Sequence, residues 1–79
     1  MIDLESPVPP FHQLKGLLAA RIASGQMVAG TKLTTRGLAE AYRLDKNTAN
    51  RAIASLAADG LVEVIRGRGS FVTRQSPVP

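Results

Sequence analysis

The chain contains no cysteine and only one histidine, His12, among its 79 residues. Disulfide scaffolds, zinc fingers and cysteine nucleophiles are excluded, because each of them requires thiol groups. One histidine cannot hold a metal ion alone, and the aspartates and glutamates are scattered without the close spacing that paired catalytic acids need. We therefore expect no catalytic residue, no metal site and no cofactor in this chain.

Aromatic residues are also few, and they comprise only Phe11, Tyr42 and Phe71. The core must therefore be built mainly from leucine, isoleucine, valine and alanine. A domain of this length buries roughly 60–65% of the surface of its unfolded chain, which suffices for one modest core but not for a deep cleft. We therefore expect neither an enzymatic active site nor an effector pocket within this chain.

Long hydrophobic runs are missing as well. No run of about 18 apolar residues is present, so no helix is expected to span a membrane. The first five residues, Met-Ile-Asp-Leu-Glu, are acidic, whereas a signal peptide begins with basic residues. These features predict a cytoplasmic protein without a membrane partner.

Positive charge is abundant, with a formal net charge of +4 and a pI of about 10.4. The excess is uneven, because residues 1–42 carry a net charge of +1 and residues 43–79 carry +3. A basic domain of this kind favours an anionic partner such as nucleic acid. Charge alone fits a merely soluble basic protein equally well, so the assignment must rest on the pattern of the residues.

Apolar residues at helical spacing predict a first helix from Pro10 to the Ser24-Gly25 pair, where glycine accepts a left-handed cap. Residues 26–33 then form a loop that turns at Gly30 and ends in a very short strand, Lys32-Leu33. Thr34 or Thr35 can cap a second helix that continues to about Tyr42.

Asp45 is a good N-cap for a third helix, which runs to Asp59 and stops at Gly60. Two short strands follow at 61–65 and 70–73, joined by the glycine-containing loop 66–69. The apolar face of the second helix is expected to comprise Leu38, Ala41 and Tyr42, and that of the third Ala49, Ala52, Ile53 and Leu56. The residues expected in the core are Leu14, Leu18, Ile22, Leu38, Ile53, Leu56, Val62 and Phe71.

Two short helices joined by a tight turn form a helix-turn-helix unit, and a hairpin directly after it is a wing. The predicted fold is thus mainly α with a small β-hairpin wing: a winged helix-turn-helix of three helices and a two- or three-stranded antiparallel sheet. The domain is expected to span residues 10–74, preceded by a flexible lead-in at 1–9 and followed by a linker or tail at 75–79.

Five short segments occur in a fixed order: Ile-Ala-Ser-Gly at 22–25, Gly-Thr-Lys-Leu at 30–33, Arg-Gly-Leu-Ala at 36–39, Leu-Val at 61–62, and Arg-Gly-Arg-Gly-Ser-Phe-Val at 66–72. Together they resemble the N-terminal domain of the GntR family of bacterial transcription regulators, over about residues 9–73. The resemblance implies sequence-specific binding of double-stranded DNA with the third helix in the major groove. It also implies a homodimer on a palindromic operator, a role as a repressor at the nucleoid, and usually a C-terminal effector or dimerisation domain.

The sequence departs from the family pattern at several positions. The segment before the second helix, Leu33-Thr34-Thr35-Arg36, is one residue shorter than the usual one. Arg43 stands where glycine is usual in the turn, and a non-glycine residue with positive φ is disfavoured by about 1 kcal/mol. The other departures replace a serine by Asp45, an arginine by Lys46 and a second arginine by Asn50.

The outer face of the third helix carries the residues expected to meet DNA. Asn47 and Arg51 point away from the apolar face, and Lys46, Thr48 and Asn50 flank them. Asparagine pairs bidentately with adenine and arginine with guanine. Arg51 is therefore expected to read a base, whereas Lys46, a point charge, is expected to position the domain.

Phosphate contacts are expected from Arg36, Arg43 and the amides at Thr34 and Thr35, because a helix N-terminus favours anions. Arg36 can instead pair with Glu40 one turn later. In the wing, Gly67 allows a tight turn while its arginine neighbours suit phosphates and a narrow minor groove. The expected DNA-binding residues are Thr34, Thr35, Arg36, Arg43, Lys46, Asn47, Thr48, Asn50, Arg51, Arg66, Gly67 and Arg68.

Two other classes of function use the same fold. A winged helix that binds only protein is expected to carry an exposed apolar patch or mixed charge on its third helix. This chain has polar and basic residues there instead. An RNA-binding winged helix is expected to carry exposed aromatic residues for base stacking, and residues 43–70 contain no aromatic residue. Because no heptad repeat or spare apolar helix is present, the isolated chain is expected to be mostly monomeric and to bind a single half-site weakly.

Overall fold

The computed structural model describes residues 2 and 5–73 of the chain. The described residues form α1 (Pro10–Ala23), β1 (Lys32–Leu33), α2 (Thr35–Tyr42), α3 (Lys46–Ala58), β2 (Val62–Ile65) and β3 (Gly69–Val72). The predicted order of helices and strands, and with it the winged helix-turn-helix, is confirmed. The tail predicted at 75–79 and the domain end at residue 74 lie outside the described residues.

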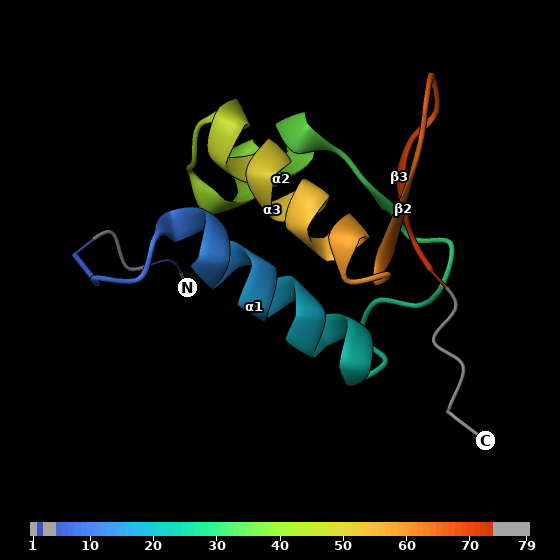
Figure 1. Ribbon diagram of the computed structural model, residues 1–79, viewed down its shortest axis with the longest axis horizontal. Coiled ribbons are helices and arrows are strands. Elements are labelled where there is room, and N and C mark those ends of the chain that lie inside the picture. The colour runs from blue at the N-terminus through green and yellow to red at the C-terminus, as the bar shows by residue number, and fades with distance from the viewer. Residues whose placement is uncertain (1, 3–4, 74–79) are drawn as a thin grey trace.

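Helix α1 begins with Pro10 at its first position, where the missing N–H of proline is harmless. It buries Leu14, Leu18 and Ile22, which are four residues apart and therefore form one stripe. Gly25 follows the helix with a φ of 84°, which stops it as expected. Helix α1 runs alongside α3 (Figure 1), and Lys15 Nζ forms an ion pair of 2.6 Å with Asp59 Oδ2 just past the end of α3.

The β-strands form a sheet in the order β1-β3-β2 within the described residues, and both pairings are antiparallel. β3 is thus the central strand, and β1 pairs with it through Lys32–Phe71 and Leu33–Ser70. β2 starts one residue later than predicted, because the Leu61 amide donates to the Leu56 carbonyl at the end of α3. The hairpin of β2 and β3 projects beyond the helices as the wing (Figure 1).

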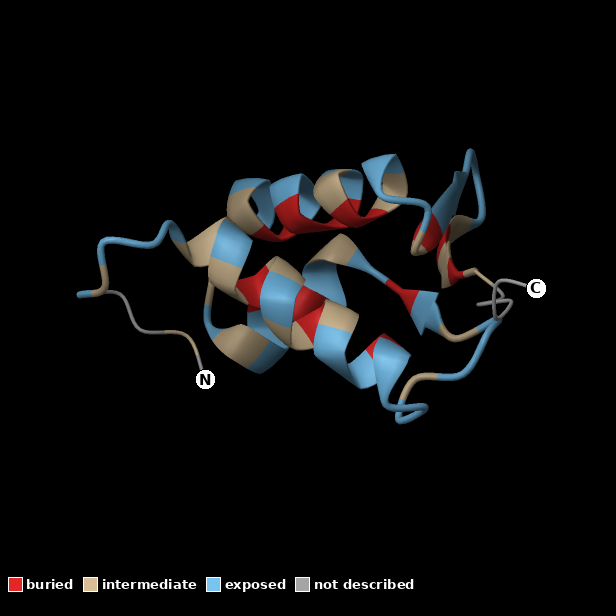
Figure 2. Cartoon of the chain, turned by 60° about the horizontal axis from the view of Figure 1, so that its bottom comes forward, coloured by how far each residue is buried: buried red, intermediate tan, exposed pale blue. Residues whose placement is uncertain are grey.

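The core lies where α1, α2, α3 and the base of the sheet meet, and the buried faces of the helices point toward this interior (Figure 2). The buried apolar residues in the described part are Leu14, Leu18, Ile22, Leu33, Leu38, Ala39, Ala49, Ala52, Ile53, Leu56, Val62 and Val72. Seven of the eight residues expected in the core are confirmed, and Phe71 is the exception.

Two expectations about burial are corrected. Along β3, Ser70 and Val72 are buried, so Phe71 points to the opposite face and is only half-buried. On α2, Ala39 rather than Ala41 completes the buried face with Leu38. In the segment before α1, Ile2 packs against the core. Part of the predicted lead-in therefore has contacts with the domain.

Candidate nucleic-acid interface

The N-terminus of α2 is shaped by Thr34 and Gly37. Thr34 is the N-cap, and its hydroxyl oxygen accepts a 2.9 Å hydrogen bond from the Gly37 amide. A Cβ on Gly37 would lie 2.6 Å from that oxygen, so only glycine leaves the cap undisturbed. Thr35 is half-buried at the first helical position. The amides predicted to meet phosphate thus lie at a well-formed helix start.

Arg36 pairs with Glu40 in the free protein, through a 3.3 Å contact between Nε and Oε1. Both side chains are highly exposed, at 80% and 69%. Exposed pairs of this i,i+4 type contribute only about 0.3–0.5 kcal/mol. The pair is therefore weak enough for Arg36 to exchange Glu40 for a phosphate. Pairing with Glu40 and binding to phosphate, the two expectations for Arg36, are thus compatible.

Arg43 forms the turn between α2 and α3 in the left-handed conformation, with φ 56° and ψ 47°. It is the one non-glycine residue with positive φ in the described part of the chain. Its amide donates to the Ala39 carbonyl and ends α2, while its side chain is exposed. The positive φ expected at this position is confirmed.

Asp45 caps α3, and its Oδ1 accepts a 3.2 Å hydrogen bond from the Thr48 amide. Hydrogen bonds from the Thr48 hydroxyl and then from its amide lower the pKa of the Asp45 carboxyl. Thr48 is half-buried and engaged with Asp45 through both groups. These contacts fix the start of α3.

The remaining outer residues of α3 form an exposed polar face. Lys46, Asn47, Asn50 and Arg51 are all exposed, as expected. Further along the helix the same face continues as Ala54 and Ala58, which are exposed but short. The capped N-terminal half of α3 thus presents amide and cationic groups on its exposed face.

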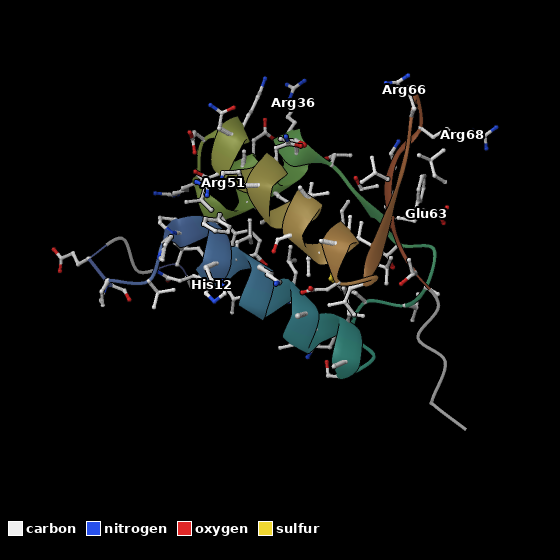
Figure 3. The ribbon with its side chains drawn as sticks, viewed as in Figure 1. His12, Arg36, Arg51, Glu63, Arg66 and Arg68 are labelled. Carbon is white, nitrogen blue, oxygen red and sulfur yellow. The ribbon has the colours of Figure 1, made fainter. Side chains whose placement is uncertain are left out.

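Arg51 does not simply extend into solvent. Its guanidinium carbon lies 4.1 Å from the centre of the Phe11 ring, in the first turn of α1. Figure 3 shows Arg51 close to the start of α1, and the His12 ring meets Phe11 edge-on at 6.1 Å. Sequence periodicity gave no sign of this contact, because it cannot reveal a contact between residues so far apart in the chain.

The wing presents Arg66, Gly67 and Arg68, all exposed, at its tip (Figure 3). Gly67 has a φ of 82°, and the Arg68 amide closes the turn on the Ile65 carbonyl at 3.0 Å. In Figure 3, Arg36 and Arg66 project toward the same upper edge of the molecule, away from α1.

Lys32 is a further cation at the wing that the sequence prediction missed. A Cβ on Gly69 would lie 2.9 Å from Lys32 Cε, so the lysine stem crosses β3 at that glycine. The register of β1 on β3 causes this placement. No local sequence signal could have shown it, because the pairing joins residues on either side of the helix-turn-helix.

Over residues 2 and 5–73, no three histidine, aspartate or glutamate side chains come together as metal ligands. None of the helices in this part of the chain combines the length and the apolar character needed to cross a membrane.

Comparisons with known proteins identify the family. Residues 11–72 match the family described as bacterial regulatory proteins, gntR family. The HTH-type transcriptional repressor NagR of Bacillus subtilis is 30% identical over 74 residues, which cover 92% of this chain and 30% of NagR. This chain therefore spans less than a third of that relative.

Solved structures agree with this assignment. YtrA from Sulfolobus acidocaldarius, a GntR-family transcription factor, matches with a TM-score of 0.86 and 31% identity over 96% of this chain and 81% of YtrA. AraR(DBD), solved in complex with operator ORX1, shares the fold with a TM-score of 0.82 at 24% identity, covering 92% of this chain and 95% of that one. The chain therefore belongs to the gntR family of bacterial regulatory proteins.

Proposed function

We propose that this chain is the operator-reading domain of a transcriptional repressor and that it binds double-stranded DNA by sequence. Family membership and the winged-helix fold support this function, and NagR is itself a transcriptional repressor. The observation that carries the proposal is the capped N-terminal half of α3, whose exposed face consists of Lys46, Asn47, Asn50 and Arg51. An α-helix of this kind fits the major groove.

The geometry around α3 supports a division of roles among these residues. Asn47 and Asn50 read base edges, with a preference for adenine, because a carboxamide matches the donor and acceptor of that base. Arg43, in the turn before α3, and Lys46, at the start of α3, contact phosphates. The phosphate contacts at the α2 start come from Thr34, Thr35 and Arg36, and those of the wing from Arg66, Gly67 and Arg68.

The operator is a palindrome that two copies of the chain occupy. Helix-turn-helix proteins generally bind half-sites about one helical turn apart as dimers, so operator symmetry mirrors protein symmetry. The isolated chain is mostly monomeric and occupies one half-site weakly. The protein acts in the cytoplasm at the nucleoid, where its operators are.

Selection of bound duplexes from a random DNA library tests the proposal. We expect enrichment of a short motif that contains adenine at the positions facing Asn47 and Asn50. Affinity for the selected duplex is then compared with that for a scrambled duplex of equal length and composition. A library that yields no motif, with equal affinity for the two duplexes, would contradict sequence-specific binding.

The alternative is a winged-helix module that binds only protein. One observation favours it: the apolar residues Val64 and Ile65 on β2 are exposed, at 57% and 36%. These two residues lie beside the arginine-bearing wing tip, however, where apolar side chains can also enter a DNA groove. Absence of any duplex binding at low salt would favour the protein-binding module.

A further inference from the structure

The stack of Arg51 on Phe11 restricts a side chain that would otherwise be free. A guanidinium within about 6 Å of an aromatic centroid is attracted to the ring face, and here the distance is 4.1 Å. Phe11 is half-buried and belongs to α1, whereas Arg51 is exposed on α3. The contact therefore holds the guanidinium at the junction of the two helices.

This junction lies at one edge of the α3 outer face. Helix α1 also contacts α3 through the ion pair of Lys15 with Asp59, two turns after Arg51. Asn47, Asn50 and Ala54 form a stripe at spacings of three and four residues, and all are exposed. Arg51 borders this stripe, and its stack draws the guanidinium toward α1 and away from Asn50.

We propose that Phe11 is a positioning residue that holds Arg51 as a phosphate clamp on the α1 side of α3. This inference rests on the proposed function. One face of the guanidinium covers the ring, while its N–H groups lie in the guanidinium plane and stay available for a bidentate contact with phosphate. A base contact would require Arg51 to leave the ring and turn toward the groove, so base reading falls to Asn47 and Asn50.

The proposal changes what an Arg51 variant should do. If Arg51 reads a base, its substitution should weaken binding only to duplexes that carry the base pair it reads. If Arg51 contacts a phosphate, its substitution should weaken binding to every duplex by the same factor. We expect Arg51→Ala to weaken the selected duplex, its single-base variants and a scrambled duplex equally. The slope of log affinity against log salt should also decrease by about 0.9, because one fewer phosphate is neutralised.

A double-mutant cycle tests the role of Phe11. Phe11→Leu keeps an apolar side chain but removes the ring, and we expect it to weaken binding about two- to five-fold, from the loss of an exposed cation–π contact. In the Arg51→Ala background, Phe11→Leu should have no further effect on affinity. Phe11→Tyr keeps the ring face and should bind like the unaltered chain.

The measurement is fluorescence anisotropy of the full chain with labelled duplexes, with circular dichroism of each variant to verify folding. Arg21→Ala is the matched control, because Arg21 lies exposed in the last turn of α1, far along that helix from Phe11. A loss confined to one base pair in Arg51→Ala, or additive effects of the two substitutions, would overturn the clamp while leaving the proposed function intact. An unaltered chain that binds no duplex would overturn both.

Discussion

At the scale of single residues, Arg43 combines a strained backbone with an exposed charge. The left-handed conformation is unfavourable for a residue with a Cβ, and arginine tolerates it here because the turn between α2 and α3 requires it. The residue that would best satisfy the backbone is glycine, which carries no charge. We therefore expect the side chain of Arg43 to serve binding at the expense of stability.

The expected result of Arg43→Gly is a gain of about 0.5–1 kcal/mol in the free energy of unfolding, because the steric penalty of the positive φ is removed. DNA affinity should fall at the same time through the loss of one phosphate contact. Arg43→Ala is the control, since it removes the charge but keeps the Cβ, and it should lose affinity without gaining stability. Chemical denaturation and DNA titration measure the two effects. Equal affinity of the three proteins would show that Arg43 makes no contact with DNA.

Asp45 makes the stability of α3 depend on pH. Its pKa is lowered in the folded chain by the Thr48 hydroxyl and amide. A carboxyl group with a lowered folded pKa contributes stability above its unfolded pKa, and the contribution disappears as the pH falls through the folded value. Since the ordinary pKa of aspartate is about 3.9, we expect the melting temperature to fall progressively below about pH 4.

Asp45→Asn separates this effect from the titration of the other carboxylates. Asparagine keeps a capping oxygen but does not titrate. The melting temperature of the variant should therefore fall less between neutral and acidic pH than that of the unaltered chain. Thermal unfolding followed by circular dichroism at a series of pH values provides the comparison. Parallel curves for the two proteins would rule out Asp45 as the titrating cap.

At the scale of elements, two helical glycines look alike in the sequence but differ in their surroundings. Gly16 lies inside α1 and a Cβ there would meet nothing within 4 Å, whereas a Cβ on Gly37 would collide with the capping oxygen of Thr34. Gly16→Ala should therefore stabilise the chain by about 0.5–1 kcal/mol through helix propensity. Gly37→Ala should give no such gain, because it disturbs the cap of α2. Urea denaturation distinguishes them, and an equal gain at both sites would contradict the role assigned to Gly37.

Local signals account for how well the helices were predicted. The caps at Thr34 and Asp45, and the stop near Gly25, each act through residues within one turn of the helix end. The burial of β3 was harder to predict because a four-residue strand gives two possible faces, and Phe71 was assigned to the wrong one. The sheet order and the stack of Arg51 on Phe11 depend on pairings between distant segments. These features were therefore not accessible from sequence periodicity.

The candidate site divides in the same way. Exposure of Asn47, Asn50 and the wing arginines was predictable, because helix periodicity and the hairpin loop place them outside. The pair of Arg36 with Glu40 was predictable as well, because the two residues are four apart on one helix. The double engagement of Thr48 with Asp45 and the position of Lys32 needed the side-chain contacts.

At the scale of the whole molecule, the positive charges determine how binding depends on salt. The cations expected to contact phosphate or the grooves are Arg36, Arg43, Lys46, Arg51, Arg66 and Arg68. With about five or six phosphates neutralised, log affinity plotted against log salt should have a slope of roughly −4.5 to −5.5. Titration of a duplex at several salt concentrations measures it. A slope near zero would be incompatible with DNA binding through this surface.

The position of β3 has a consequence for the order in which the parts of the domain can form. Among the described strands, β3 is the last in sequence but the middle one in the sheet, and β1 pairs only with β3. The residues of α1, α2 and α3 all precede residue 69, so the helices can pack without β3, whereas β1 cannot pair until residues 69–72 are present. The antiparallel pairing of residues 32 and 71 then closes a loop around the entire helix-turn-helix. A released chain that ends just before residue 69 should therefore form α3 without the sheet that accompanies it.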